Sequence, residues 1–126
     1  MNYTKLSPGE REMKIILDEI LPEETFIDNF RPDWLKNPNT NRNLELDRYY
    51  PNLKIGFEYN GLQHRKKINA EQWERDKIKK TLCGKEGVIK LVVYKKELIK
   101  SIILDKIKDA KEMKECWKNG KSWSKK

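Results

Sequence analysis

Two short strand-like segments, separated only by Pro51 and Asn52, constrain the fold more than any other part of the sequence. Residues 44–50 (LELDRYY) and 53–59 (LKIGFEY) combine apolar, aromatic and β-branched side chains, a composition typical of strands. Two strands joined by so short a connection can only pair antiparallel. We therefore expect a β-hairpin that turns at Pro51 and Asn52.

Sequence patterns before the hairpin predict a helix and a further strand. Ser7 as cap, Pro8 at the first helical position and Glu10 three residues after the cap are typical of a helix start. Pro22 ends this helix, and residues 24–30 form a plausible short strand. The apolar face of the helix is formed by Met13, Ile16, Leu17, Ile20 and Leu21.

Beyond the hairpin, the chain adds a helix, a strand and a final helix. Asn69 can cap a helix over residues 70–83, which we expect Gly84 to stop. Residues 88–94 form a nearly continuous β-branched run, typical of a strand buried on both faces. The last helix has one broad apolar face made of Leu98, Ile99, Ile102, Ile103, Ile107, Ala110 and Met113.

This order of elements predicts an α/β domain whose mixed sheet is covered by helices. The first three strands can form a meander, whereas the fourth follows a crossover helix and can pair in parallel. A chain of 126 residues is long enough for one modest core but not for two. We expect a single domain over residues 1–117 and a basic, flexible tail over residues 118–126.

The charge of the chain favours a polyanionic partner. The formal net charge is +8, and it divides into −3 for residues 1–32, +5 for residues 33–94 and +6 for residues 95–126. A field of this sign attracts nucleic acid. Equally, lysine-rich proteins encoded by AT-rich genomes often carry such an excess of positive charge without using it.

Composition also argues against several classes of site and location. Cys83 and Cys116 form no CxxC pair, and with His64 as the single histidine a structural zinc site is not expected. The N-terminus has no apolar signal region, and no run approaches transmembrane length. We expect an intracellular, cytoplasmic protein (in the host-cell interior if viral) that is not secreted and has no membrane partner.

Asp47 and Glu58 interrupt the two apolar strands of the hairpin, where an unpaired charge is costly. The turn places residue 47 opposite residue 57 or 58, so the two carboxylates can converge and bind Mg²⁺ together with water and a substrate phosphate. The alternative is a pair of solvated charges, with Asp47 beside Arg48 or Arg42 and Glu58 beside Lys54.

The stretch LELDRYYPNLKIGFEYNGLQH resembles the core of the PD-(D/E)XK nuclease superfamily. It looks most like the EDxHD-like branch that includes very-short-patch repair endonucleases and related homing endonucleases. The resemblance runs from about residue 7 to residue 94 and implies a restriction-endonuclease-like αβββαβ core. The matching motifs are SPGE, ELDRYYP, FEYNGLQH and WERDKIKK, which supply Glu10, Asp47, Glu58, Gln63, His64 and Asp76.

The chain departs from this superfamily at the motif lysine. The position two residues after Glu58 is Asn60, where the branch commonly has Asp and the Gln-His pair stands in for lysine. Asp33 follows a proline but lies in a loop region, too far upstream to be the hairpin partner.

The resemblance implies a role for each matched residue. Asp47, Glu58 and the Tyr59 carbonyl would bind Mg²⁺, for which Mn²⁺ substitutes. Gln63 would orient the attacking water, and His64 would act as general base or contact the scissile phosphate. Glu10 and Asp76 would complete the catalytic set. Backbone phosphates would be bound by Arg65, Lys66, Lys67, Lys77, Lys79 and Lys80.

Each role has a structural alternative. Glu10 can complete a capping box with Ser7, and Asp76 can pair with Lys80 one turn later. His64 can be a surface residue at a strand exit. The lysines can form a solvated helix face, and Trp34 and Trp73 are expected in core or lid packing rather than base stacking.

The resemblance implies a metal-dependent DNA endonuclease that leaves a 5′-phosphate. Its substrate would be DNA, including branched or nicked DNA, and its activity of the nicking, repair, junction-cleaving or homing type. The protein would act as a monomer or homodimer. The rival function is a nuclease-fold DNA-binding protein that has lost turnover, which Asn60 supports. An RNA-binding α/β protein ranks last, because the chain has no RNP-like aromatic signature or GXXG loop.

Overall fold

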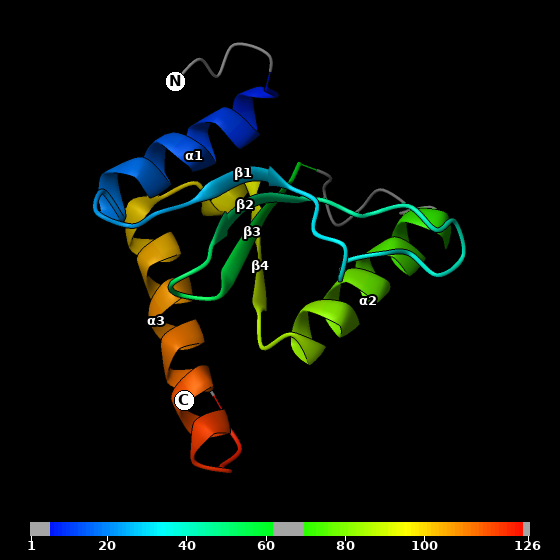
Figure 1. Cartoon of the computed structure of the whole chain (residues 1–126). Coiled ribbons are helices and arrows are strands. Elements are labelled where there is room, and N and C mark those ends of the chain that lie inside the picture. The colour runs from blue at the N-terminus through cyan, green and yellow to red at the C-terminus, as the bar shows by residue number, and fades with distance from the viewer. Residues whose placement is uncertain (1–5, 62–69, 125–126) are drawn as a thin grey trace.

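The computed structural model describes residues 6–61 and 70–124, which form a four-stranded sheet and three α-helices (Figure 1). A short 3₁₀ turn, η1, connects the last strand to the last helix. The elements in chain order are α1 (Pro8–Ile20), β1 (Ile27–Phe30), β2 (Leu46–Tyr50), β3 (Ile55–Asn60), α2 (Ala70–Lys85), β4 (Ile89–Tyr94), η1 (Lys95–Glu97) and α3 (Lys100–Lys118). The expected αβββαβα order is confirmed.

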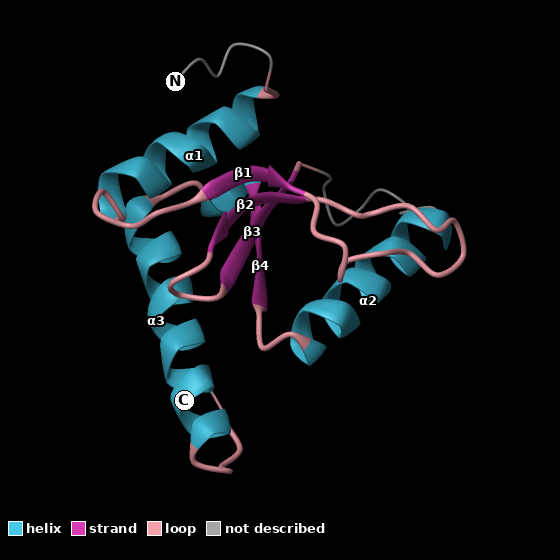
Figure 2. Cartoon of the chain, viewed as in Figure 1, coloured by secondary structure: helices cyan, strands magenta, loops and turns pink. Residues whose placement is uncertain are grey.

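The sheet has the strand order β1-β2-β3-β4, in which the β1–β2 and β2–β3 pairs are antiparallel and the β3–β4 pair is parallel. This arrangement confirms the predicted meander followed by a crossover. Helices α1 and α3 cover one face of the sheet and α2 covers the other (Figure 2). None of the helices in residues 6–61 and 70–124 has the length and apolar content needed to cross a bilayer.

The predicted hairpin forms, although its turn covers residues 51–54 instead of Pro51 and Asn52 alone. Tyr50 pairs with Ile55 across a turn of residues 51–54, in which Lys54 adopts a positive φ of 53°. The observed register pairs Arg48 with Phe57. Continued by one residue, this register sets Asp47 opposite Glu58, as expected from the turn.

Helix α1 begins as the sequence predicts. The Ser7 hydroxyl oxygen accepts a hydrogen bond from the Glu10 amide at 3.3 Å, and Pro8 occupies the first turn, where an amide hydrogen would have no helical partner. The helix ends at Ile20, just before Pro22.

Two apolar clusters, one on each face, hold the sheet between its helices. The larger cluster joins α1 and α3 to the sheet and contains Met13, Leu17, Tyr50, Phe57, Val93, Ile103 and Ile107. The smaller cluster joins α2 to the other face and contains Leu35, Leu46, Tyr49, Cys83 and Val88. The thiol of Cys83 is buried there.

The predicted end of α2 at Gly84 is wrong, because the helix continues to Lys85 and Gly87 provides the termination. Gly87 has a φ of 72°, a conformation that side-chain-bearing residues rarely adopt. Its amide bonds the Gly84 carbonyl at 3.1 Å, and the Val88 amide bonds the Cys83 carbonyl at 2.8 Å. These two bonds form a Schellman motif, which satisfies the last carbonyl groups of the helix.

Two expectations about burial also need correction. β4 is an edge strand in the described sheet, so only Ile89 and Val93 are buried in it, rather than both faces along its whole length. In α3, Ile103 and Ile107 are buried as predicted, but Ile99 precedes the helix and is half exposed. The division into a domain over residues 1–117 and a tail over residues 118–126 stays a prediction; α3 itself extends to Lys118.

Candidate functional site

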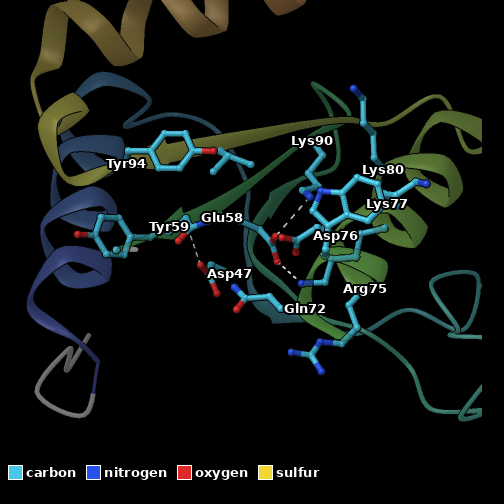
Figure 3. Close-up of a pocket in the computed structure, with 15 residues that line it drawn as sticks. Asp47, Glu58, Tyr59, Gln72, Arg75, Asp76, Lys77, Lys80, Lys90 and Tyr94 are labelled. Atoms are coloured by element: carbon cyan, nitrogen blue, oxygen red, sulfur yellow. Dashed lines mark hydrogen bonds and ion pairs between the residues drawn. The ribbon is translucent and has the colours of Figure 1, made fainter. Parts of the chain in front are cut away.

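A pocket of about 560 Å³ lies between the sheet and α2 (Figure 3). It combines carboxylates from the hairpin with a basic face of α2. Strands β2, β3 and β4 contribute Asp47, Glu58, Tyr59, Asn60, Lys90, Val92 and Tyr94. Helix α2 contributes Gln72, Trp73, Arg75, Asp76, Lys77, Lys79 and Lys80, and Gly61 completes the wall. The structure thus brings both hairpin carboxylates to one pocket, together with five other sequence-predicted residues, Tyr59, Asp76, Lys77, Lys79 and Lys80.

Asp47 is the carboxylate whose environment least favours its charge. Burial raises the pKa of Asp47 to about 6, and the nearby charges of Glu10 and Glu58 add to the rise. The Tyr59 amide, which donates a hydrogen bond to Asp47 Oδ2 at 2.8 Å, and the charge of Lys14 act in the opposite direction. Asp47 is therefore poised to gain from a cation or a proton.

Glu58 is ion-paired with lysines that approach from two sides. Lys79 of α2 bonds Glu58 Oε1, and Lys90 Nζ of β4 lies 3.8 Å from Oε2. The Glu58 side chain is only 14% exposed, so these cations offset its desolvation. Figure 3 shows the Glu58 carboxylate directed toward Lys90 rather than toward Asp47.

Among the described residues, no ion pair joins Asp47 to Arg48 or Arg42, or Glu58 to Lys54, so the predicted alternative pairings do not form there. Lys54 bonds the Glu86 carbonyl at 3.4 Å instead of Glu58. Arg48 bonds Asp28 and Asp18, each at 2.7 Å, rather than its neighbour Asp47. Asp47 and Glu58 are therefore not a pair of solvated hairpin charges.

Glu10 reaches the neighbourhood of Asp47 because α1 begins directly beside Tyr59. A Cβ atom on Gly9 would lie 2.0 Å from Cζ of the Tyr59 ring, so only glycine permits this approach. The Glu10 amide serves the helix cap, whereas its carboxylate pairs with Lys14 at 3.1 Å. The structure therefore shows the Ser7 half of the predicted capping box, while the Glu10 carboxylate pairs with Lys14.

Two pocket residues of helix α2, Asp76 and Trp73, have surroundings that differ from those predicted. Within the described residues, no ion pair joins Asp76 to Lys80, so the predicted surface pair does not form. Trp73 is 54% exposed and lies in the pocket wall, so of its two expected roles, core packing is wrong and lid packing stays a prediction. Trp34 does pack beside an apolar cluster, with its ring centroid 6.2 Å from that of Phe30.

Five predicted residues lie outside the described residues. They are Gln63, His64, Arg65, Lys66 and Lys67, and their roles stay predictions. Asn69, the expected cap of α2, also lies outside.

Sequence reasoning missed Lys90, Arg75 and Gln72, and it treated Lys79 only as a phosphate contact. Lys90 did carry a signal, because a lone lysine inside a β-branched strand needs a carboxylate partner as much as Glu58 needs a cation. Arg75 and Gln72 carried none, since exposed polar residues on a helix are ordinary.

The oxygen donors of the pocket can be compared with the ligands that a bound metal ion requires. Within residues 6–61 and 70–124, no group of three or more His, Cys, Asp or Glu side chains is placed to bind a metal. Mg²⁺ requires less, since one or two carboxylates with water and substrate phosphate complete its octahedron. Asp47 and Glu58 fit that requirement in chemistry and location, and Glu58 would exchange a lysine for the ion.

Comparisons with known proteins connect the chain to iridoviruses. It is 42% identical over 93 residues to uncharacterized protein 307L of Invertebrate iridescent virus 6, covering 62% of this chain and 47% of that protein. It is 38% identical over 72 residues to uncharacterized protein 033L of Invertebrate iridescent virus 3 (50% and 37%), and 37% identical over 71 residues to uncharacterized protein 094L of Frog virus 3 (48% and 46%).

The chain thus spans less than half the length of these relatives. No protein-family model matches it, and no solved structure matches it. The chain is a relative of iridovirus proteins, and its function has to be inferred from the pocket.

Proposed function

We propose that this protein is a Mg²⁺-dependent DNA endonuclease of the PD-(D/E)XK type, with Mn²⁺ able to substitute. One observation carries the proposal: a single pocket combines Asp47 and Glu58, from adjacent strands, with a basic face of α2. Carboxylates recruit a divalent cation, and the lysines attract a phosphodiester. Metal-dependent hydrolysis of a nucleic acid backbone requires both carboxylates and basic side chains around the same phosphate.

The donors that would hold the metal are the carboxylates of Asp47 and Glu58 and the carbonyl of Tyr59. A divalent cation bound there would polarise the phosphate and neutralise charge that develops on it. The raised pKa of Asp47 supports such a role, because the counter-charge around it does not offset its burial. Lys14, the cation that acts on Asp47, is itself paired with Glu10 and Asp28.

The residues of the chain would position substrate and water around this centre. Lys79 lies close enough to bond Glu58 and supplies the ammonium group that Asn60 lacks. Lys77 and Lys80 would hold the backbone phosphates, and Gln63 and His64 would orient and deprotonate water. Water would attack phosphorus in line as the bond to the 3′ oxygen breaks, leaving a 5′-phosphate and a 3′-hydroxyl.

The fold supports the same proposal. The αβββαβ order and the mixed sheet with its parallel β3–β4 pair are compatible with a restriction-endonuclease-like core. We infer a nicking, repair, junction-cleaving or homing activity on DNA inside the cell, the host-cell interior in the case of a virus. A monomer or a homodimer would carry it out.

The test is nicking of supercoiled plasmid with Mg²⁺, with Mn²⁺ and with EDTA. Wild-type protein should nick only with metal, and Asp47→Asn and Glu58→Gln should each reduce the rate at least about 100-fold, since a metal ligand contributes several kcal/mol to the transition state. Glu45→Gln, in a residue next to β2 but absent from the pocket wall, is the matched control and should nick normally. Intact plasmid under every metal condition would contradict the proposal.

A second candidate is a nuclease-fold protein that binds DNA without cleaving it. Two observations favour it: Glu58 is occupied by Lys79 and Lys90, and its carboxylate points away from Asp47. Under this hypothesis the Lys79–Glu58 pair persists in the presence of metal. Isothermal titration with Mn²⁺ discriminates the candidates, since metal binding that Asp47→Asn abolishes supports the enzyme, and undiminished DNA binding without metal uptake supports the binding protein.

A further inference from the structure

Trp73 is an exposed aromatic residue in the wall of a highly polar pocket. Its surface is 54% exposed, although burying a tryptophan side chain is strongly favourable in water. It extends from the first turn of α2, and the same pocket contains the carboxylates of Asp47 and Glu58. An aromatic ring exposed in the wall of a pocket is placed where a bound ligand can stack on it.

The surroundings of Trp73 specify the charge of that ligand. Lys77 Nζ lies 4.3 Å from the centroid of the Trp73 ring, one helical turn away, in a cation–π contact. Arg75 and Lys80 line the same pocket. Lys77 thus lies over one face of the indole ring, and a ligand that stacks on the other face would have positive charge close by, which suits an aromatic group attached to a phosphate.

We propose that Trp73 is a stacking platform for an unpaired nucleobase, and that the pocket selects DNA with a single-stranded or displaced nucleotide beside the bound phosphate. This inference rests on the proposed function and names its substrate class. Within a duplex, both faces of each base are covered by neighbouring bases, so the indole ring has no face to stack on. An unpaired base offers a free face, and stacking on an aromatic side chain is tolerant of sequence.

The cations around Trp73 favour nucleic acid over a protein partner. Exposed tryptophan is also common at protein interfaces, where it fills an apolar pocket surrounded by contacts that exclude water. Here the neighbouring lining residues are Gln72, Asp76 and the three cations Arg75, Lys77 and Lys80, all of them polar or charged. Such a surface is better suited to a phosphodiester chain than to the apolar patch of another protein.

The experiment measures binding of the full chain to fluorescent oligothymidylate and to a long, fully paired duplex by anisotropy, in EDTA so that no cleavage occurs. Trp73→Ala should weaken binding to the single strand about 5- to 150-fold and binding to the duplex less than about 2-fold. Trp73→Phe, which keeps an aromatic face, should retain most of the affinity for the single strand. Lys77→Gln should weaken both and lower the salt dependence of each.

The matched control is Trp117→Ala. Trp117 is 49% exposed, lies near the end of α3 and is absent from the pocket wall, so its removal should change neither affinity. Equal losses on both DNAs in Trp73→Ala, or no loss on the single strand, overturn the inference, and the second result would point to a protein partner. Because the assay needs no turnover, Trp73-dependent binding without plasmid nicking would refute the endonuclease and leave the platform standing.

Discussion

Adjacent residues of β2 belong to two charge clusters with opposite properties. Arg48 is fully buried and bonds Asp28 and Asp18, each at 2.7 Å, while its guanidinium lies 3.7 Å from the centroid of the Phe26 ring. We call this group the Arg48 cluster. Asp47, one residue earlier, lines the open pocket and has no such set of partners among the described residues.

The partners explain the difference. Hydrogen bonds to Asp28, Tyr50 and Asp18 outweigh burial and raise the pKa of Arg48 still further above its ordinary value. At Asp47, burial and neighbouring carboxylates outweigh one amide hydrogen bond, so its pKa also rises, but here the rise disfavours the charge. The buried charge of Arg48 is thus compensated by its partners, and the Arg48 cluster is structural. The buried charge of Asp47 is not compensated, so the pocket is available to a ligand that supplies a positive charge.

The largest effect should follow from breaking the Arg48 cluster. Arg48→Met removes the buried cation that Asp28 and Asp18 share and leaves Asp28 with Lys14 alone, so we expect a loss of about 3–5 kcal/mol in the free energy of unfolding. Urea denaturation measures it. The matched control is Arg31→Met, because the Arg31 side chain is 64% exposed and pairs with Glu45 at 3.1 Å. This substitution should lower the free energy of unfolding by less than about 1 kcal/mol. Similar losses in both variants would mean that the buried cluster is no more structural than a surface pair.

The next effect is the pH dependence that Asp47 imposes on stability. Its pKa is about 6 in the folded protein and 3.8 as the ordinary value, so the folded state binds the proton more tightly. The stability that Asp47 contributes is therefore fully present below about pH 4 and is lost as the pH rises through about 6. As the pH rises through this window, the free energy of unfolding of Asp47→Asn should come to exceed that of the wild type by about 1–3 kcal/mol.

Urea denaturation of both proteins at a series of pH values checks this expectation. The carboxamide oxygen of the Asp47→Asn variant can still accept the Tyr59 amide bond, so the comparison isolates the charge. Asp105→Asn, at an exposed position of α3, controls for removal of a carboxylate outside the pocket. Parallel stability curves for wild type and Asp47→Asn would show that the pocket is as well compensated as the Arg48 cluster.

The smallest effect should come from Gly9→Ala, which disturbs the contact that brings α1 to the pocket. Alanine favours a helix over glycine by about 1 kcal/mol, but a Cβ 2.0 Å from the Tyr59 ring forces that ring to move, at a cost of about 1–3 kcal/mol. We expect a net loss of about 1 kcal/mol, measured by urea denaturation. Gly84→Ala in α2, where a Cβ meets no atom within 4 Å, should instead stabilise the protein. Higher stability in both variants would show that the Tyr59 ring moves aside without a measurable cost, which contradicts the prediction.

Much of the fold follows from local sequence patterns. The hairpin register depends on a turn at residues 51–54 and on side chains that alternate between faces, and both are visible in the sequence. The parallel pairing of β4 follows from the length of the crossover through α2. The end of α2 was mispredicted because two glycines, Gly84 and Gly87, stand three residues apart, and only the backbone conformation distinguishes them.

The candidate site was less predictable, because its partners come from different elements. Asp47 and Glu58 lie on one hairpin, so their approach follows from its register. The contacts of Glu58 with Lys79 and Lys90 depend on how α2 and β4 pack against β3, which no local pattern reveals. The exposure of Trp73 was likewise hidden, since an aromatic residue in a helix is ordinarily part of a core.

The crossover from β3 through α2 to β4 also has a consequence for folding kinetics. Glu58, Lys79 and Lys90 all belong to this one unit, residues 55–94. The contacts of Glu58 span 21 and 32 residues of chain and involve no residue of α1 or α3, so we expect them to form when this unit closes. The carboxylate of Glu58 is therefore buried in the same step that delivers its cations.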